Sequence, residues 1–259
     1  MRFAPVCPIH VYEALAEAGH EYIGDYFLLL AHDVLANQKR YADFFQYRKA
    51  TIIMDNSVIE LGNACTAANL FEAAAVVGSG NDLCVAIPDV LQDGVATLER
   101  AQTFLDEWHG IQGSNKFSRM YIPQGKDIND FSICMEQGLY TFPDEFEWVG
   151  IARNLTDRIF PTRKIAAGYI SRIVGDHVRL HLLGFSDNVA DDIDTCQHLA
   201  PYIEGIDSAV PLRLGTKGVS VGVADVYPAT GPRGDWWDTV KVNDILLENT
   251  LAFRQRIER

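Results

Sequence analysis

The chain has 259 residues, of which 48% are hydrophobic, and it carries a net charge of −13. This length and composition supply a sizeable hydrophobic core and exclude a disordered protein. The acidic balance argues against a protein that coats nucleic acid without specificity, since such binding comes from clustered Lys and Arg.

Short apolar runs typical of β-strands alternate along the chain with amphipathic stretches typical of helices. Continuous apolar strands indicate burial on both faces, as in a parallel sheet. The repeats run without a linker and predict one domain over residues 1–259, a (β/α)8 TIM barrel rather than a doubly wound sheet. The predicted strands are residues 26–32, 50–56, 83–89, 119–125, 148–152, 179–185 and 205–209, with a candidate eighth at 219–224. The clearest predicted helices are residues 66–78, 94–110 and 191–203.

Polar or glycine positions fall at or near the C-terminal ends of six predicted strands, and in barrels that rim carries the active site. Each of them alone also fits a turn or a helix cap, but the six together favour a site. They are Asp55, Asp89, Gln124, Gly150, Gly184 and Asp207.

These rim groups suit the recognition of a planar, polar heterocycle. Asp89 offers an acceptor for the N–H groups of a purine, and Gln124 and the Gly150 backbone offer donors for its carbonyl oxygen. Asp55 and Asp207 are then free to act as proton-transfer group and nucleophile, the division of labour in retaining glycosyl transfer. After Asp207, breaks at proline and glycine predict a basic loop above the rim.

Residues 207–218, DSAVPLRLGTKG, resemble the signature of the tRNA-guanine transglycosylase superfamily, in which an Asp nucleophile precedes a Pro-x-Arg-x-Gly segment. Further short segments resemble that family in the same order along the chain. They are MDNS (54–57), PD (88–89), YIPQG (121–125), VGIA (149–152) and HLLGF (181–185).

The resemblance implies a base-exchange enzyme that replaces guanine with a 7-deazaguanine such as preQ0. Asp207 would attack the sugar carbon to give a covalent glycosyl-enzyme, and Asp55 would serve as general acid and base. We expect Arg213 and Lys217, which follow Asp207, to contact phosphates. The full set of substrate-binding residues that we predict is Asn56, Asp89, Gln124, Gly125, Gly150, Leu183, Gly184, Arg213 and Lys217.

The chain departs from the family in two places. The segment NSVIELG after Asp55 replaces Ser-Gly-Gly-Phe-Gln, and residues 218–259 contain no Cys or His, so the zinc subdomain of the tRNA enzymes is missing. The resemblance is therefore to the phage-type enzymes, with DNA, guanine and the free 7-deazaguanine as partners and tRNA as an alternative. A non-catalytic purine-binding barrel is a further alternative. So is a glycoside hydrolase on small sugars, although the rim motifs supply few aromatic platforms.

Charge along the chain points to where a polyanion would dock. Residues 1–150 carry 9 basic and 21 acidic side chains, whereas residues 151–217 carry 8 of each, a pattern that an ordinary mixed-charge surface also explains. Docking is expected on the later part. Its basic residues are Arg153, Arg158, Arg163, Lys164, Arg172, Arg179, Arg213 and Lys217.

The cysteines indicate neither a disulfide framework nor a thiolate zinc site, because they are scattered and form no C-x-x-C pair. We expect no metal and no other cofactor. No apolar stretch reaches the roughly 18 residues of a membrane span, and the start lacks a secretory signal, so a cytoplasmic location is expected, in the host if a phage encodes the chain. The oligomeric state stays open. The cysteines are Cys7, Cys65, Cys84, Cys134 and Cys196.

Overall fold

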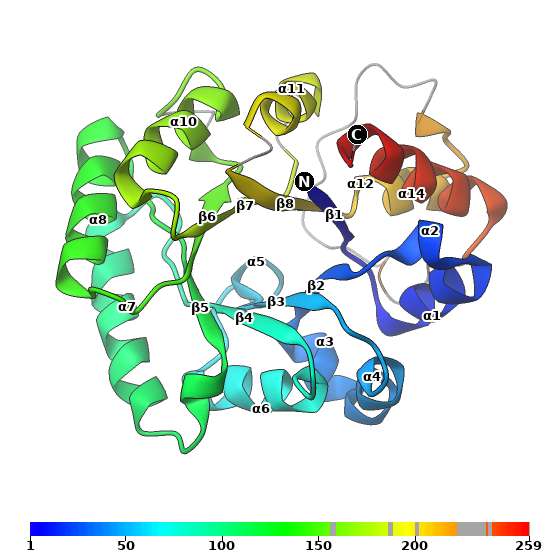
Figure 1. Cartoon of the computed structure of the whole chain (residues 1–259), viewed down its shortest axis with the longest axis horizontal. Coiled ribbons are helices and arrows are strands. Elements are labelled where there is room, and N and C mark those ends of the chain that lie inside the picture. Colours follow the sequence, from blue (N-terminus) through cyan, green and yellow to red (C-terminus); the bar gives the residue numbers. More distant parts are fainter. Residues whose placement is uncertain (156–158, 186–188, 200–201, 222–236, 238–239, 259) are drawn as a thin grey trace.

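The structure, a computed structural model, describes residues 1–155, 159–185, 189–199, 202–221, 237 and 240–258. Eight parallel strands alternate with helices and form a (β/α)8 TIM barrel, which confirms the predicted fold class (Figure 1). The strands are β1 (Arg2–Pro5), β2 (Tyr26–Leu30), β3 (Thr51–Asp55), β4 (Asp82–Ala86), β5 (Ser118–Tyr121), β6 (Trp148–Ala152), β7 (Arg179–Leu183) and β8 (Ile203–Ser208).

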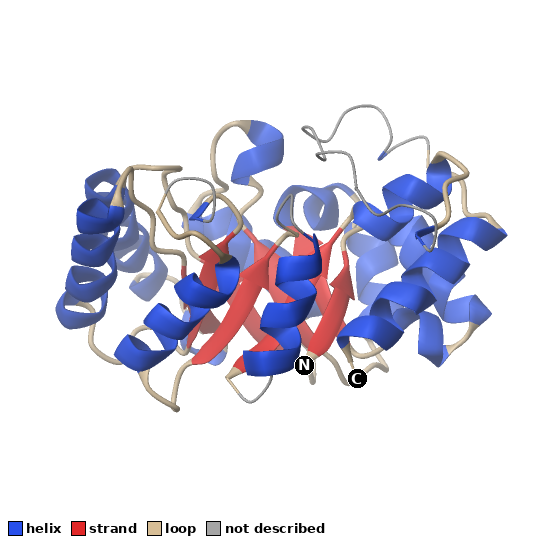
Figure 2. Cartoon of the chain, turned by 90° about the horizontal axis from the view of Figure 1, so that it is seen from above, coloured by secondary structure: helices blue, strands red, loops and turns tan. Residues whose placement is uncertain are grey.

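Helices surround the strands on the outside of the barrel (Figure 2). Several begin at a Thr, Asp or Asn whose side chain accepts a backbone N–H of the first turn, the capping expected of these residues. Thr66, Asp93 and Asn243 are examples. The helices are α1 (Ile9–Ala18), α2 (His20–Ile23), α3 (Ala31–Ala36), α4 (Gln38–Phe45), α5 (Val58–Leu61), α6 (Ala67–Val77), α7 (Gly94–His109), α8 (Ile128–Thr141), α10 (Arg163–Val174), α11 (Val189–Leu199), α12 (Val210–Thr216) and α14 (Asp244–Ile257).

Strand β2 shows why these sequences form buried parallel strands. All five of its residues are buried, because alternate side chains enter two different cores. Tyr26 and Leu28 belong to the core inside the barrel, whereas Phe27 packs edge-on against the rings of Tyr12 and Phe45 on the helices outside. The continuous apolar run that predicted this strand therefore reflects burial on both faces.

The prediction missed the first strand of the barrel, and its candidate eighth strand at 219–224 was wrong in the part that the structure describes. Residues 219 and 220 form no strand, and residues 222–224 lie outside the described residues. The missing strand is β1, which pairs with β8 and places Ala4 opposite Asp207. Its sequence RFAP is too short, and ends too early at Pro5, to give a strand signal. Asp207 therefore lies on the eighth strand.

The segment after Asp207 also differs from its prediction. Residues 210–216, expected to form a basic loop, form helix α12. Pro211 lies in its first turn, where the fixed φ of proline suits a helix and its missing N–H costs no hydrogen bond. Gly215 lies within this helix because a Cβ there would come 2.3 Å from Leu246 Cα of the packed helix α14. This glycine therefore permits close helix packing and does not mark a turn.

Tyr12 joins the two ends of the strand order, β1 and β2. Its buried hydroxyl lies 2.6 Å from the Pro5 carbonyl oxygen and 2.9 Å from that of Leu28. We expect Tyr12→Phe to lower the free energy of unfolding by about 1–3 kcal/mol, since it leaves these buried carbonyls without their donor. Urea denaturation measures this, with Tyr47→Phe as control because Tyr47 is 88% exposed. Equal midpoints for both variants would show that the hydroxyl contributes nothing.

Candidate active site

A cavity of about 450 Å³ opens at the C-terminal ends of the strands, the edge to which the arrowheads point in Figure 2. Residues that end or follow β3 to β8 line it, as the barrel architecture predicts. Apolar Ile59 and Leu91 form part of the wall on the β3–β4 side. The volume suits a molecule of one or two rings with its substituents.

The structure brings together most of the predicted site residues. Gly125, Gly150 and Lys217 lie outside the cavity lining. Gly125 packs on α8, and Gly150 sits inside β6, where a Cβ would come 2.8 Å from Leu183 Cδ1. Both glycines thus have packing roles, and Lys217 is exposed after α12. The predicted residues that line the cavity are Asp55, Asn56, Asp89, Gln124, Leu183, Gly184, Asp207 and Arg213.

Asp207 is held at the end of β8 through one carboxylate oxygen. Its Oδ1 accepts the Gly184 backbone N–H at 2.9 Å and the His181 Nε2–H at 3.0 Å. Within the described part of the chain, Oδ2 has no hydrogen-bond partner, although the residue lines the cavity. Hydrogen bonds to a carboxylate are strong and directional, so Oδ1 is anchored and Oδ2 is available to a ligand.

Asp55, at the end of β3, lies in an environment that disfavours its ionised form. Burial raises the pKa of Asp55 well above its ordinary value, and the negative charges of Glu60, Asp207 and Asp89 raise it further. The one opposing effect is the Ser57 N–H, which donates to Asp55 Oδ1 at 2.7 Å from a left-handed backbone conformation with φ 61°. Asp55 therefore retains a proton at a pH where an ordinary Asp has lost it.

Asp89 and Gln124 are bonded to each other. Gln124 Nε2 donates to Asp89 Oδ2 at 2.7 Å, and Asn56 Nδ2 donates to Asp89 Oδ1 at 3.3 Å. The Gln124 Oε1 accepts the Gln92 N–H and the Asn154 amide, each at 3.3 Å. Burial raises the pKa of Asp89, and its two amide donors oppose that effect. The pair braces the cavity wall, and a ligand would have to replace these bonds.

Two arginines line the same cavity on the β6–β8 side, Arg153 and Arg213. The Arg153 stem lies over the end of β7, where its Cδ is 3.6 Å from the position of a Cβ on Gly184. Burial lowers the pKa of Arg213, and the charge of Arg153 lowers it further. Two like charges on one side of the cavity make its electrostatic potential favourable to an anionic group.

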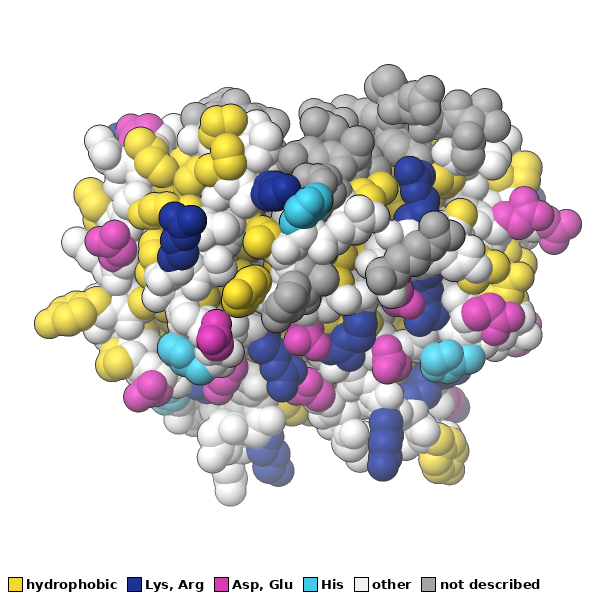
Figure 3. Space-filling model, turned by 45° about the horizontal axis from the view of Figure 1, so that its top comes forward, with side chains coloured by type: hydrophobic (Ala, Val, Ile, Leu, Met, Phe, Trp, Pro, Cys, Tyr) yellow, Lys and Arg dark blue, Asp and Glu magenta, His cyan; other side chains and the backbone are white. Residues whose placement is uncertain are grey.

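The expected polyanion surface is not supported by the placement of its residues. Arg163 is fully buried, and Arg179 lies at the N-terminal end of β7, where it pairs with Asp82 at 2.5 Å. On the face seen in Figure 3, basic and acidic side chains are interspersed. The described basic residues of the later half therefore do not all lie on one face, and Arg158 lies outside the described residues.

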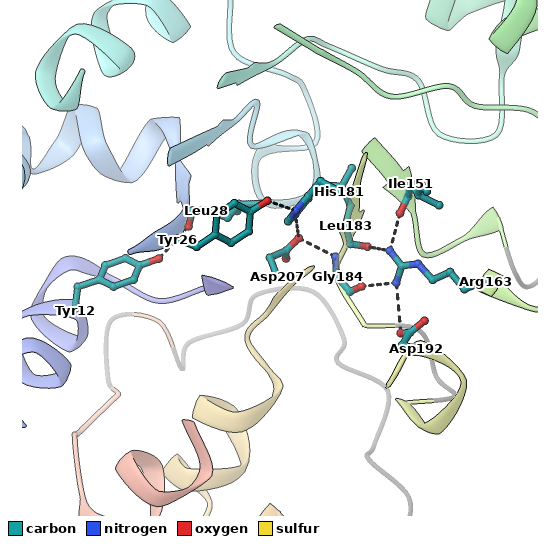
Figure 4. Close-up of polar contacts among 10 residues, drawn as sticks. All are labelled: Tyr12, Tyr26, Leu28, Ile151, Arg163, His181, Leu183, Gly184, Asp192 and Asp207. Carbon is teal, nitrogen blue, oxygen red and sulfur yellow. Dashed lines mark hydrogen bonds and ion pairs between the residues drawn. The ribbon is translucent and has the colours of Figure 1, made fainter. Parts of the chain in front are cut away.

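Arg163, at the start of α10, instead supports the site from beside the ends of β6 and β7 (Figure 4). Its guanidinium donates to the carbonyl oxygens of Ile151 at 2.6 Å, Leu183 at 2.8 Å and Gly184, and it pairs with Asp192 at 3.4 Å. These bonds tie the ends of β6 and β7 together. The Gly184 N–H that holds Asp207 is thereby fixed.

Sequence reasoning missed three further groups at the site. His181 and Tyr26 lie within strands and point inward, and the histidine in the middle of the apolar run RLHLL was the available signal. Trp237 lines the cavity together with Phe185, far along the chain from every rim motif. Trp237 therefore adds a second aromatic side chain to the cavity, besides Phe185 of the motif HLLGF.

Other features of the described residues bear on cofactors and membranes. No group of three or more His, Cys, Asp or Glu among them is placed to hold a metal ion. The described cavity lining contains no Lys. None of the described helices has the length and apolar character of a membrane span.

No protein-family model matches the chain, and no curated protein matches it either. Among solved structures, it resembles an oxaloacetate acetylhydrolase in complex with the inhibitor 3,3-difluorooxalacetate, at 11% identity and a TM-score of 0.51, over 100% of this chain and 90% of that one. It also resembles YagE, a prophage protein of the dihydrodipicolinic acid synthase family from E. coli K12, at 12% identity and a TM-score of 0.44, over 83% and 76%. At such identities the likeness concerns the fold alone.

The predicted membership of the tRNA-guanine transglycosylase superfamily is wrong, and so is the predicted exchange of guanine for a 7-deazaguanine in DNA or tRNA. A solved structure that the chain resembles at a TM-score above 0.5 is an oxaloacetate acetylhydrolase and not a guanine transglycosylase. The geometry of the site also argues against guanine recognition, because Asp89 and Gln124 bond to each other and Gly150 lies outside the cavity lining. The purine-binding alternative loses its support for the same reason.

Proposed function

We propose that the chain is an enzyme that hydrolyses a glycosidic bond in a small anionic molecule, with Asp55 as general acid and Asp207 as general base. One observation carries this proposal: two carboxyl groups share a cavity at the barrel rim in different environments. Burial and nearby negative charges raise the pKa of Asp55, whereas Asp207 is held through Oδ1 by the Gly184 N–H and His181. A difference in environment of this kind is the usual basis for assigning the acid and the base of a carboxyl pair.

The proposed reaction uses side chains of this chain and water. The Asp207 Oδ2 takes a proton from a water molecule, whose oxygen attacks the anomeric carbon. The bond from that carbon to the leaving group breaks as Asp55 gives its proton to the leaving atom. Exchange of protons with solvent then restores both carboxyl groups. Trp237 and Phe185 in the cavity wall supply apolar surface for a sugar ring.

A second candidate is the cleavage of a carbon–carbon bond in a small oxo-acid. The two arginines of the cavity suit carboxylate groups, and the oxaloacetate acetylhydrolase shares the fold. This reaction needs a group that accepts the electron pair of the broken bond, and the described lining has no Lys that could form an imine for that purpose. Glycosidic hydrolysis needs no such group, so we prefer it.

The test is a panel of O- and N-glycosides, with and without a phosphate or carboxylate group, beside oxaloacetate and related oxo-acids. Products are identified by mass spectrometry. Hydrolysis of a glycoside by the parent protein, lost in Asp55→Asn and Asp207→Asn but kept in Asp106→Asn, supports the proposal. Asp106 is an exposed residue of α7 and serves as the matched control. Cleavage of an oxo-acid with no glycoside hydrolysed would favour the second candidate.

The cavity arginines lead to a prediction about binding. We expect Arg213→Gln to raise KM for an anionic substrate about 10-fold and to change kcat little, because a lost charge-assisted hydrogen bond acts on the bound substrate as on the transition state. Lys217→Gln is the comparison, since Lys217 lies outside the cavity lining. A neutral substrate should show no such rise. Equal effects of both variants would instead indicate a long-range charge effect.

A further inference from the structure

Three side chains from three strands form a buried chain of hydrogen bonds inside the barrel (Figure 4). His181 lies in the middle of β7, with Nε2 3.0 Å from Asp207 Oδ1 and Nδ1 2.7 Å from the Tyr26 hydroxyl. Tyr26 is the first residue of β2, and Asp207 lies near the end of β8. The chain thus runs from the N-terminal part of the barrel up to the cavity. His181 is 0% exposed and Tyr26 is 1% exposed.

The hydrogen bonds fix where the protons lie. The Tyr26 hydroxyl has one hydrogen, and within the described residues its one hydrogen-bond partner is His181 Nδ1. Burial raises the pKa of Tyr26 well above its ordinary value, so the hydroxyl keeps this hydrogen, and donation to His181 Nδ1 is what gives the hydrogen a partner among the described residues. Nδ1 is therefore an acceptor without a proton, and the imidazole proton lies on Nε2, where it is donated to Asp207.

The Tyr26 ring is itself held in one position. The Arg2 guanidinium carbon lies 4.6 Å from the ring centroid on one side, and Arg2 also pairs with Glu204. Gly205 of β8 leaves room for the ring, because a Cβ there would come 2.2 Å from Tyr26 Cε1. With the ring fixed, the direction of the hydroxyl toward His181 is fixed as well.

We propose that Tyr26 and His181 are positioning residues for Asp207: they keep a donor on Oδ1 and so direct Oδ2 to the cavity. The role of Asp207 in chemistry rests on the proposed function, whereas the proton assignment does not. Neither residue lines the cavity, so both act through Asp207. Their loss should lower kcat and leave KM nearly unchanged, the pattern of a group that orients another.

The first experiment needs no substrate. Long-range ¹H–¹⁵N NMR of the full chain reports which imidazole nitrogen carries the proton, and His181→Gln identifies the His181 signals. We expect the proton on Nε2, and an Nδ1 resonance that shifts in Tyr26→Phe, where the hydrogen bond to Nδ1 is lost. Tyr12→Phe removes another buried hydroxyl and should leave the resonance in place. A proton on Nδ1, or an Nδ1 resonance that does not move in Tyr26→Phe, would overturn the inference.

The second experiment measures kinetics on the glycoside that the panel identifies. We expect His181→Leu to lower kcat about 100-fold with KM changed by less than about two-fold, and Tyr26→Phe to lower kcat about 10-fold. His181→Gln retains an N–H donor and should recover most of kcat. Parent kcat in His181→Leu, or a Gln variant that folds normally yet is no better than Leu, would refute the positioning role. If the parent hydrolyses no glycoside, the proposed function fails, and the NMR result still decides the proton assignment.

Discussion

Replacing Asp207 by asparagine is expected to lower kcat by about 100- to 10,000-fold and to leave KM nearly unchanged. The amide oxygen of asparagine can still accept from the Gly184 N–H and from His181, so the local geometry should survive. What is lost is the negative charge that takes the proton of the attacking water. The base acts in the transition state, and ground-state binding does not depend on it.

Steady-state kinetics of the parent and of Asp207→Asn test this expectation, with substrate binding measured separately by calorimetry. Asp106→Asn, the same substitution at an exposed position, is the control. A variant that binds as the parent does but turns over slowly fits the prediction. A loss of less than about 10-fold would remove Asp207 from the proton transfer.

Asp55→Asn is expected to lower kcat by about 100- to 10,000-fold and, at neutral pH, to raise the free energy of unfolding. The kinetic loss follows because the amide has no proton to give to the leaving group. The gain in stability follows because burial and three nearby negative charges disfavour the ionised carboxyl, and the amide removes that conflict. Opposite effects on kcat and on stability are the signature of a residue retained for chemistry.

The sign of the pH dependence follows from the raised pKa of Asp55. The folded state holds this proton more tightly than the unfolded state does, so its contribution to stability is full below the ordinary Asp pKa. The contribution is lost as the pH rises through the raised folded pKa. Over the same range kcat should fall, since the general acid becomes ionised.

Urea denaturation over a series of pH values measures the stability part of this prediction in the parent and in Asp55→Asn. The parent should lose stability relative to the variant as pH increases. The difference should disappear in acid, where the carboxyl is protonated in both folded and unfolded chains. A difference that grows toward low pH would mean that Asp55 is ionised in the folded protein.

The fold could be predicted because strand burial on both faces leaves apolar runs in the sequence. Residues 26–32 and 148–152 are such runs; β2 covers Tyr26–Leu30 of the first, and β6 covers all of the second. Strand β1 escaped detection because Arg2–Pro5 provides four residues and ends at a proline. Its place beside β8 depends on barrel closure, which is a property of the whole sheet.

Part of the candidate site could be predicted, because some of its residues lie at the C-terminal ends of strands. Asp55 and Asp207 stand where strands end, and parallel strands bring those ends to one edge. His181 and Tyr26 stand inside strands, and their meeting depends on the register of β7 and β2 across the barrel, which no local pattern encodes. Short motifs around Asp89 suggested a ligand, whereas in the fold its partner is Gln124.

Asp207 is held in part by buried groups that lie outside the cavity lining, and this bears on how the substrate range of the barrel can be changed. The groups that hold the carboxylate in place, such as His181 in β7 and Arg163 at the start of α10, are fully buried, whereas Ile59 and Leu91 of the cavity wall are about half exposed. Random mutation of these two wall residues should alter which molecules enter without erasing proton-transfer capacity. Laboratory evolution of this protein should therefore begin at Ile59 and Leu91, which are separate from the buried residues that hold Asp207.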